Sequence, residues 1–135
     1  MHVRRRDVLP VKVQTDIVLV RQKVRLLTSE LGFRLINQTK LVTAASELAR
    51  NTLEYGGGGA VQLEIVEGAV GKVGLRLSFE DQGPGIPDLE VAMTDGYTSG
   101  HGLGMGLSGS KRLVDEFDIW TKVGEGTRVT VTGWR

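Results

Sequence analysis

The sequence predicts an α+β domain in which helices pack on one face of a mainly antiparallel β-sheet. Two long segments place apolar residues three or four positions apart, which is typical of amphipathic helices. Later segments alternate apolar and polar residues and are joined by short connections that contain glycine, as in β-hairpins. A chain of 135 residues supports one hydrophobic core, so we expect a single domain over residues 1–135.

The first elements are a short strand and a helix. The strand is expected from Val8 to Val13, and Thr15 or Asp16 can cap the helix that follows, with Gly32 at its end. The apolar positions of this helix are Ile17, Val20, Val24, Leu27 and Leu31. Their spacing defines one buried stripe.

A second helix is expected from about Asn37 to Tyr55, where a run of four glycines ends it. One face carries Leu41, Ala45, Leu48 and Thr52. Glu47 and Asn51 fall on another side of the helix, one turn apart, so their side chains point the same way.

Strict alternation predicts two antiparallel strands around residues 61–65 and 73–79, with Gly68 and Gly71 in the turn between them. The second strand brings Asp81 to its end. These two strands are expected to form the centre of the sheet.

The segment from Gln82 to Gly109 is rich in glycine and has little apolar periodicity. It is long for a connection in a compact domain, so we interpret it as a ligand-binding loop. A third helix fits Leu107 to Phe117, and a last hairpin pairs residues 119–123 with 127–131.

Charge and composition argue against several classes of protein. A net charge of +1 provides no strong field for nucleic acid or an anionic membrane, so we expect neither partner. The absence of cysteine and the two separate histidines favour a reducing, cytoplasmic setting without a zinc site, and no apolar run is long enough for a membrane span. The basic run Arg4, Arg5 and Arg6 is expected in a frayed terminus over residues 1–7.

The pair Glu47 and Asn51 could serve a phosphoryl-transfer site. Magnesium in such sites takes few protein ligands, so one amide oxygen of Asn51 would suffice and Glu47 would be free to act as a base. Taken alone, such a pair more often marks a solvated helix face.

Two glycine-containing motifs follow. Asp81 precedes Gly83 and Gly85, whose missing side chains let a flat ring lie against the backbone while the acid accepts a hydrogen bond from an adenine amino group. A simple strand-terminating turn is the alternative.

Further on, alternating glycines from Gly100 to Gly106 expose N–H groups that can cradle phosphate oxygens.

Other nucleotide-binding signatures are absent or out of context. The pattern of glycines over residues 104–109 matches the dinucleotide motif, but no strand precedes it within a βαβ unit. No Walker A sequence and no eukaryotic-type kinase signature occurs. A kinase with this sequence would belong to another lineage.

Taken in order, the motifs resemble the N box and the three glycine boxes of the GHKL superfamily, whose ATP-binding domain is the Bergerat sandwich. The matching motifs are Glu47 with Asn51, Asp81-x-Gly83-x-Gly85, Gly102-Leu103-Gly104-Met105-Gly106-Leu107 and Gly124-x-Gly126-Thr127. Their order and register make the match specific.

Within that superfamily, the chain resembles the small bacterial anti-sigma regulatory kinases that consist of the ATP domain alone, and among these the stressosome switch kinases. The stretches that carry the likeness are residues 46–51, 80–88, 95–97 and 111–117. The resemblance implies a serine/threonine kinase that transfers the γ-phosphate of Mg-ATP to STAS-domain scaffold proteins. It further implies a change of partner that activates a PPM-type phosphatase in a bacterial stress or sigma-factor signalling cascade.

The resemblance also assigns roles to residues. Glu47 would be the base for the acceptor hydroxyl, Asn51 the magnesium ligand and Asp81 the acceptor for the adenine amine, supported by Thr127. Gly83 and Gly85 would pass the adenine ring. The phosphate lid would contain Gly102, Leu103, Gly104, Gly106 and Leu107. His101 and Met105 are bulkier than the residues expected in this lid.

Two other functions remain open from the sequence. One is an anti-sigma factor that acts mainly as a nucleotide-dependent binding module. The other is a plain ATPase domain of a larger GHKL protein, with water as the phosphate acceptor.

Overall fold

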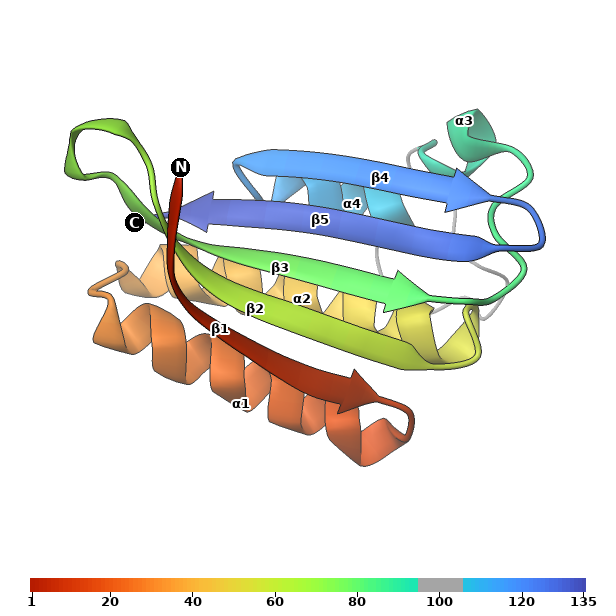
Figure 1. Cartoon of the computed structure of the whole chain (residues 1–135), viewed down its shortest axis with the longest axis horizontal. Helices are drawn as coiled ribbons and strands as arrows, with labels where there is room; N and C mark the ends of the chain where they lie inside the picture. The colour runs from red at the N-terminus through yellow and green to blue at the C-terminus, as the bar shows by residue number, and fades with distance from the viewer. Residues whose placement is uncertain (95–105) are drawn as a thin grey trace.

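An antiparallel sheet and a layer of helices make up the computed structural model, which describes residues 1–94 and 106–135 (Figure 1). The elements are β1 (His2–Val11), α1 (Gln14–Glu30), α2 (Leu35–Glu54), β2 (Gly59–Glu67), the 3₁₀ turn η1 (Ala69–Gly71), β3 (Val73–Asp81), α3 (Leu89–Ala92), α4 (Gly106–Arg112), β4 (Glu116–Lys122) and β5 (Gly126–Trp134). The strand order is β1-β2-β3-β5-β4, and every pairing is antiparallel. The predicted α+β class is confirmed.

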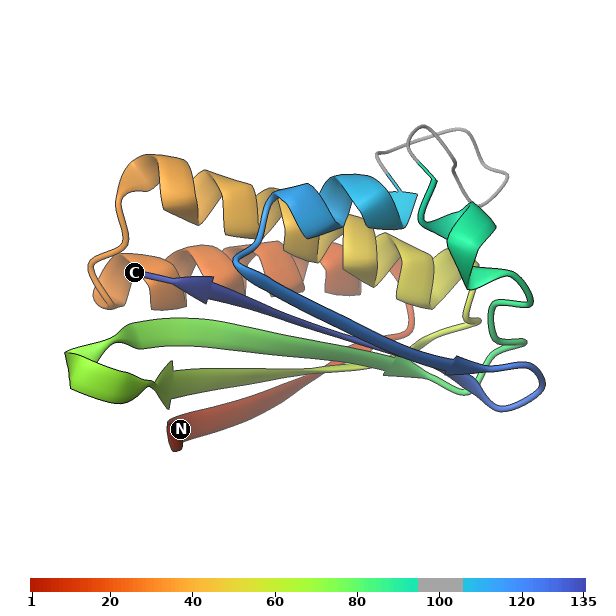
Figure 2. The same ribbon diagram turned by 90° about the horizontal axis from the view of Figure 1, so that it is seen from above.

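The helices all lie on one face of the sheet, as Figure 2 shows. Across that face α1 lies near β1, α2 in the middle and α4 behind β5 and β4 (Figure 1). The fully buried side chains between the two layers include Val20 and Val24 from α1, Leu41 and Leu48 from α2, and Val61, Leu75, Leu77 and Val131 from the sheet. The predicted apolar stripes of both long helices therefore form the core.

The N-terminal segment corrects one prediction. Residues 1–7 were expected to fray, but β1 pairs with β2 from His2 opposite Glu67 to Val11 opposite Gly59, with one register shift between Val3 and Arg5. The arginines of this segment find acidic partners: Arg5 is paired with Asp7, and Arg6 with Glu64. The basic run is therefore part of an edge strand.

The start of α1 differs from the expectation in detail. The N-cap residue is Val13, and neither Thr15 nor Asp16 takes that position. The Asp16 carboxylate lies in the first turn and accepts hydrogen bonds from the backbone N–H groups of Lys12 (2.9 Å) and Val13 (3.1 Å). Asp16 thus stabilises the start of the helix by reaching back to it.

The structure of the segment after β3 also differs from the prediction. The predicted helix from Leu107 to Phe117 ends at Arg112, and Phe117 lies in β4 opposite Val131. The segment expected to be a loop contains the short helix α3, where the Asp88 carboxylate accepts a hydrogen bond from the Val91 N–H (3.2 Å). The short apolar stretch around Phe117 is compatible with either a helix or a strand. It forms a strand because it pairs with β5.

No helix within residues 1–94 and 106–135 is long and apolar enough to span a membrane.

On the sheet face that the helices leave uncovered, Glu64 connects β1, β2 and β3. Its carboxylate accepts hydrogen bonds from Arg6 Nη2 (2.8 Å) and Arg76 Nε (2.9 Å). Burial on its own raises the pKa of Glu64, but the hydrogen bonds and charge of Arg76 and the hydrogen bonds of Arg6 outweigh it, so the pKa lies below the ordinary value of 4.5.

This lowered pKa predicts a pH dependence of stability. A carboxyl whose pKa is lower in the folded chain stabilises the fold above its unfolded pKa, and that stabilisation is lost as the pH falls through the folded pKa. We expect the free energy of unfolding, measured in urea from pH 6 down to pH 3, to fall less steeply in Glu64→Gln than in the wild type below about pH 4.5. The matched control is Glu54→Gln, at an exposed position of α2, which should keep the wild-type slope. Identical slopes in all three proteins would contradict this role of Glu64.

Candidate functional site

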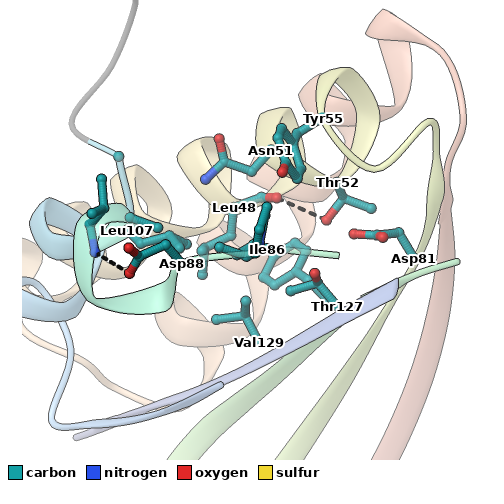
Figure 3. A pocket seen from close by; sticks show the side chains of 15 residues that line it. Leu48, Asn51, Thr52, Tyr55, Asp81, Ile86, Asp88, Leu107, Thr127 and Val129 are labelled. Carbon is teal, nitrogen blue, oxygen red and sulfur yellow. Dashed lines mark hydrogen bonds between the residues drawn. The ribbon is translucent and has the colours of Figure 1, made fainter. Parts of the chain in front are cut away.

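A cavity of about 160 Å³ lies between the C-terminal half of α2, the ends of β3 and β5, and the segment around α3 (Figure 3). Its apolar wall consists of Leu48, Phe79, Ile86, Pro87, Val91, Ala92, Leu107 and Val129. Its polar groups come from Asn51, Thr52, Tyr55, Asp81, Asp88 and Thr127. A mostly apolar pocket with a few convergent polar groups is typical of sites for a small organic ligand.

Asp81 is the acidic group at the inner end of the cavity. It is the last residue of β3, it is only 8% exposed, and its carboxylate accepts a hydrogen bond from the Gly83 N–H (2.9 Å). Burial raises the pKa of Asp81, and the N–H groups of Gly83 and Thr127 counteract part of that rise. The carboxylate is therefore a desolvated acceptor that faces a ligand-sized space.

Three glycines allow the backbone to pack closely around Asp81. A Cβ atom on Gly56 would overlap the Asp81 side chain, and a Cβ on Gly126 would overlap the Asp81 carbonyl. A Cβ on Gly83 would lie 2.6 Å from the Gly56 carbonyl oxygen. Glycine is therefore required at positions 56 and 126 by the close approach to Asp81, and at position 83 by the close approach to the Gly56 backbone. From the sequence, Gly56 was predicted only to end a helix.

Thr127 lies opposite Asp81 in the β3–β5 pairing and shares a hydroxyl network with Thr121 of β4. The Ile86 N–H donates to Thr121 Oγ1 (2.9 Å), and the Thr121 hydroxyl donates to the Gly126 carbonyl (3.1 Å). Because the Thr121 hydroxyl hydrogen is already donated to Gly126, the Thr127 hydroxyl is the donor in the contact between Thr127 Oγ1 and Thr121 Oγ1 (2.9 Å). The Thr127 oxygen therefore stays available to accept a hydrogen bond from a ligand. Thr121 had no predicted role.

Tyr55 ties the segment after β3 to the end of α2. Its hydroxyl donates to the Gly85 carbonyl (2.9 Å), while its ring lines the cavity (Figure 3). Gly85 has a φ of +76°, and a Cβ there would overlap the Lys122 carbonyl. The backbone at Gly85 is thus fixed between α2 and the β4–β5 hairpin. From the sequence, Tyr55 was predicted only to be the last residue of a helix.

Glu47 lies one helical turn before Asn51. It is 6% exposed, and its Oε1 accepts a hydrogen bond from Arg50 Nη1 at 2.7 Å. Asn51 lines the cavity, but Glu47 is absent from its wall. The two residues share one side of α2, and only Asn51 reaches the ligand-sized space.

The predicted site residues therefore fall into three groups. Those that line the cavity are Asn51, Asp81, Gly106, Leu107 and Thr127. Those that lie near it without forming its wall are Glu47, Gly83 and Gly85. Those outside the described residues are Gly102, Leu103 and Gly104, together with His101 and Met105.

The donor set of the cavity suits a hard cation that is held mainly by its substrate. Within residues 1–94 and 106–135 no group of three or more His, Cys, Asp or Glu side chains could hold a metal ion. The Asn51 side chain carries an amide oxygen and lines the cavity, and Mg²⁺ in phosphate-binding sites takes one or two protein oxygens while phosphates and water supply the rest. The residues present fit such an ion.

Comparisons with known proteins give a match to one family model and to relatives of similar length. Residues 36–133 match the model of the histidine kinase-, DNA gyrase B-, and HSP90-like ATPases. The serine/threonine-protein kinase RsbT of Bacillus subtilis is 46% identical over 124 residues, which is 92% of this chain and 92% of that protein. An anti-sigma F factor of Clostridium kluyveri is 30% identical over 112 residues, covering 81% of this chain and 79% of the factor.

Two solved structures share the fold. The RsbU and RsbW domains of a Mycobacterium tuberculosis protein superpose with a TM-score of 0.62 at 21% identity, covering 97% of this chain and 33% of the other. A chain of the SiaB–SiaC complex of Pseudomonas aeruginosa gives a TM-score of 0.57 at 13% identity, covering 98% of this chain and 91% of the other. At these identities the likeness concerns the fold alone.

Tyr55→Phe tests the tie between α2 and the segment at Gly85. The variant keeps the ring that lines the cavity and removes the hydroxyl that donates to the Gly85 carbonyl, so we expect it to lower the free energy of unfolding in urea by about 1 kcal/mol. Thr43→Val, which deletes an exposed hydroxyl on the same helix, is the control and should change stability by less than about 0.5 kcal/mol. Equal stability of Tyr55→Phe and the wild type would mean that the hydrogen bond contributes nothing.

Proposed function

We propose a mechanism for this chain from the premise that it belongs to the histidine kinase-, DNA gyrase B-, and HSP90-like ATPase family and is an RsbT-like serine/threonine-protein kinase. It transfers the γ-phosphate of Mg-ATP to a serine or threonine of a STAS-domain scaffold protein in the cytoplasm. After release from that scaffold it activates a PPM-type phosphatase. The observation that carries the proposal is the near full-length likeness to RsbT, and the meeting of Asn51, Asp81 and Thr127 at one cavity supports it.

The base of the nucleotide occupies the inner end of the cavity. Asp81 accepts a hydrogen bond from the adenine amino group, and the Thr127 oxygen supports this contact from the neighbouring strand. The apolar wall, which includes Leu48, Ile86 and Val129, covers the faces of the ring. Gly83 and Gly85, by their place in the glycine motif after Asp81, would let the backbone pass close to the base.

The phosphates point toward the start of α4. Gly106 and Leu107 line the cavity at that point. Gly102, Leu103 and Gly104 precede them in the same glycine motif, and by that motif they would complete the phosphate lid. Asn51 would supply one amide oxygen to magnesium, and the ion would offset negative charge on the phosphates. Catalysis in such a site depends mainly on holding donor and acceptor in line.

Glu47 acts as the base. The hydroxyl oxygen of the partner's serine or threonine forms a bond to the γ-phosphorus while the bond from that phosphorus to the bridging oxygen of ADP breaks. The hydroxyl proton passes to the Glu47 carboxylate, and ADP leaves. The place of Glu47, one turn before Asn51 on the same side of α2, supports this role.

A second candidate function is that of an anti-sigma factor that binds a sigma factor in a nucleotide-dependent manner. The likeness to an anti-sigma F factor, at 30% identity, is the observation that favours it. Co-purification of the chain with a sigma factor, without labelling of a STAS-domain protein, would support this candidate over the first.

The kinase reaction is tested with γ-labelled Mg-ATP and a STAS-domain protein encoded beside this one. We expect label on a serine or threonine of that partner, and we expect Glu47→Ala to lower the transfer rate by about 10²- to 10⁴-fold while nucleotide affinity is largely kept. The matched control is Glu54→Ala, an exposed glutamate on the same helix, which should transfer at the wild-type rate. Full turnover in Glu47→Ala would remove Glu47 from the role of base.

The magnesium and adenine contacts are tested by titration of ATP with and without Mg²⁺. We expect Asn51→Ala to bind ATP as the wild type does in EDTA but to lose the gain in affinity that Mg²⁺ gives. Asp81→Asn should weaken binding about 10- to 100-fold in both conditions, because its contact is to the base. An Asn51→Ala affinity that rises with Mg²⁺ as in the wild type would assign the metal to other residues.

A further inference from the structure

Glu47 is a buried carboxylate on α2 that lies outside the wall of the cavity. Its Oε1 accepts a hydrogen bond from Arg50 Nη1 at 2.7 Å. Among the residues that the structure describes, Arg50 is the only one that donates to this carboxylate. A carboxylate shielded from water is stable only when a partner offsets its charge, so the state of Glu47 depends on Arg50.

Arg50 has two acidic residues within reach along the helix. Glu47 precedes it by three positions and Glu54 follows it by four, and both spacings bring side chains together on a helix surface. The ion pair forms with Glu47, which is buried, and not with Glu54, which is exposed. The guanidinium is therefore directed toward the proposed base.

The bond from Arg50 uses only one oxygen of Glu47. No described residue donates to Oε2, so this oxygen is able to accept a proton. A glutamate side chain rotates about several bonds, and a charge-assisted hydrogen bond at one oxygen restricts that rotation. Arg50 itself is absent from the cavity wall, whereas the next residue, Asn51, lines it (Figure 3). The position of Arg50 therefore suits contact with the carboxylate and not with a ligand in the cavity.

We infer that Arg50 is a positioning residue for the proposed base: its guanidinium holds Glu47 by Oε1, so that Oε2 receives the proton of the acceptor hydroxyl. The inference rests on the proposed function and adds to it a residue that acts through Glu47. A base must lie within hydrogen-bond reach of the proton that it takes, and a displacement of about 1 Å can lower a rate about 100-fold. The planar guanidinium fixes the direction of the bond, which a lysine would leave freer.

Transfer of label from γ-labelled Mg-ATP to the STAS-domain protein encoded beside this chain tests the inference. We expect Arg50→Ala to lower kcat by ~10- to 100-fold and to leave KM for ATP and for the partner within ~2-fold of the wild type. Arg50→Lys restores a cationic donor with less directional geometry, so it should be several-fold faster than Arg50→Ala. Lys40→Ala, which removes an exposed cation from the same helix, is the control and should transfer at the wild-type rate.

Two double-mutant cycles separate positioning from other roles. In Glu47→Ala, the additional change Arg50→Ala should leave the transfer rate unaltered, because no carboxylate remains to be positioned. In the absence of nucleotide and partner, Arg50→Ala should lower the urea midpoint of the otherwise wild-type chain, because it leaves a buried carboxylate without its partner. The same change should lower the midpoint of Glu47→Ala much less. This second cycle does not depend on kinase activity.

Several results would overturn the inference. Weaker ATP binding by Arg50→Ala, with a loss of rate that persists in Glu47→Ala, would assign Arg50 to the phosphates. A higher KM for the STAS-domain protein at unchanged kcat would assign it to the partner, and faster transfer by Arg50→Ala would mean that the ion pair restrains the base. If Glu47→Ala loses turnover and Arg50→Ala keeps it, the inference alone fails. If Glu47→Ala also keeps full turnover, the proposed base fails with it.

Discussion

The register between β3 and β5 is the constraint on which the site depends. It sets Asp81 opposite Thr127 and directs both side chains toward the helices. A slip of one residue would turn Asp81 to the uncovered face of the sheet and would also expose Leu77 and Phe79 to water. The hydrophobic core and the polar end of the cavity therefore enforce the same alignment.

The close approach of backbone segments around Asp81 follows from that alignment. Gly56, Gly83 and Gly126 come from three different parts of the chain, and each allows a contact that a Cβ atom would prevent. The arrangement has a cost in stability, because it buries a carboxylate whose pKa burial raises. A polar group held in this way at the end of an apolar pocket marks a place where binding has been favoured over stability.

The sequence predicted the elements with strong periodicity and missed those that depend on distant partners. α2, β2 and β3 carry long, regular apolar patterns, and their positions were predicted closely. Residues 1–7 looked like a solvated basic run because Glu64, the partner of Arg6, lies 58 positions away in sequence. In the site, Asn51, Asp81 and Thr127 could be named from ordered motifs, whereas Tyr55, Gly56 and Thr121 matter only through contacts between separate segments.

The strand order also has a consequence for how the chain folds. The β2–β3 and β4–β5 pairs are hairpins between neighbours in sequence, but β3 and β5 are joined across the whole segment from residue 82 to residue 125. Closing so long a loop loses conformational entropy before the β3–β5 contacts can offset that loss. The two hairpins should therefore form earlier than the β3–β5 pairing. The cavity spans that pairing, and a folding chain with both hairpins complete would still lack a place for the base. Competence to bind nucleotide would then arise only at the last stage of folding.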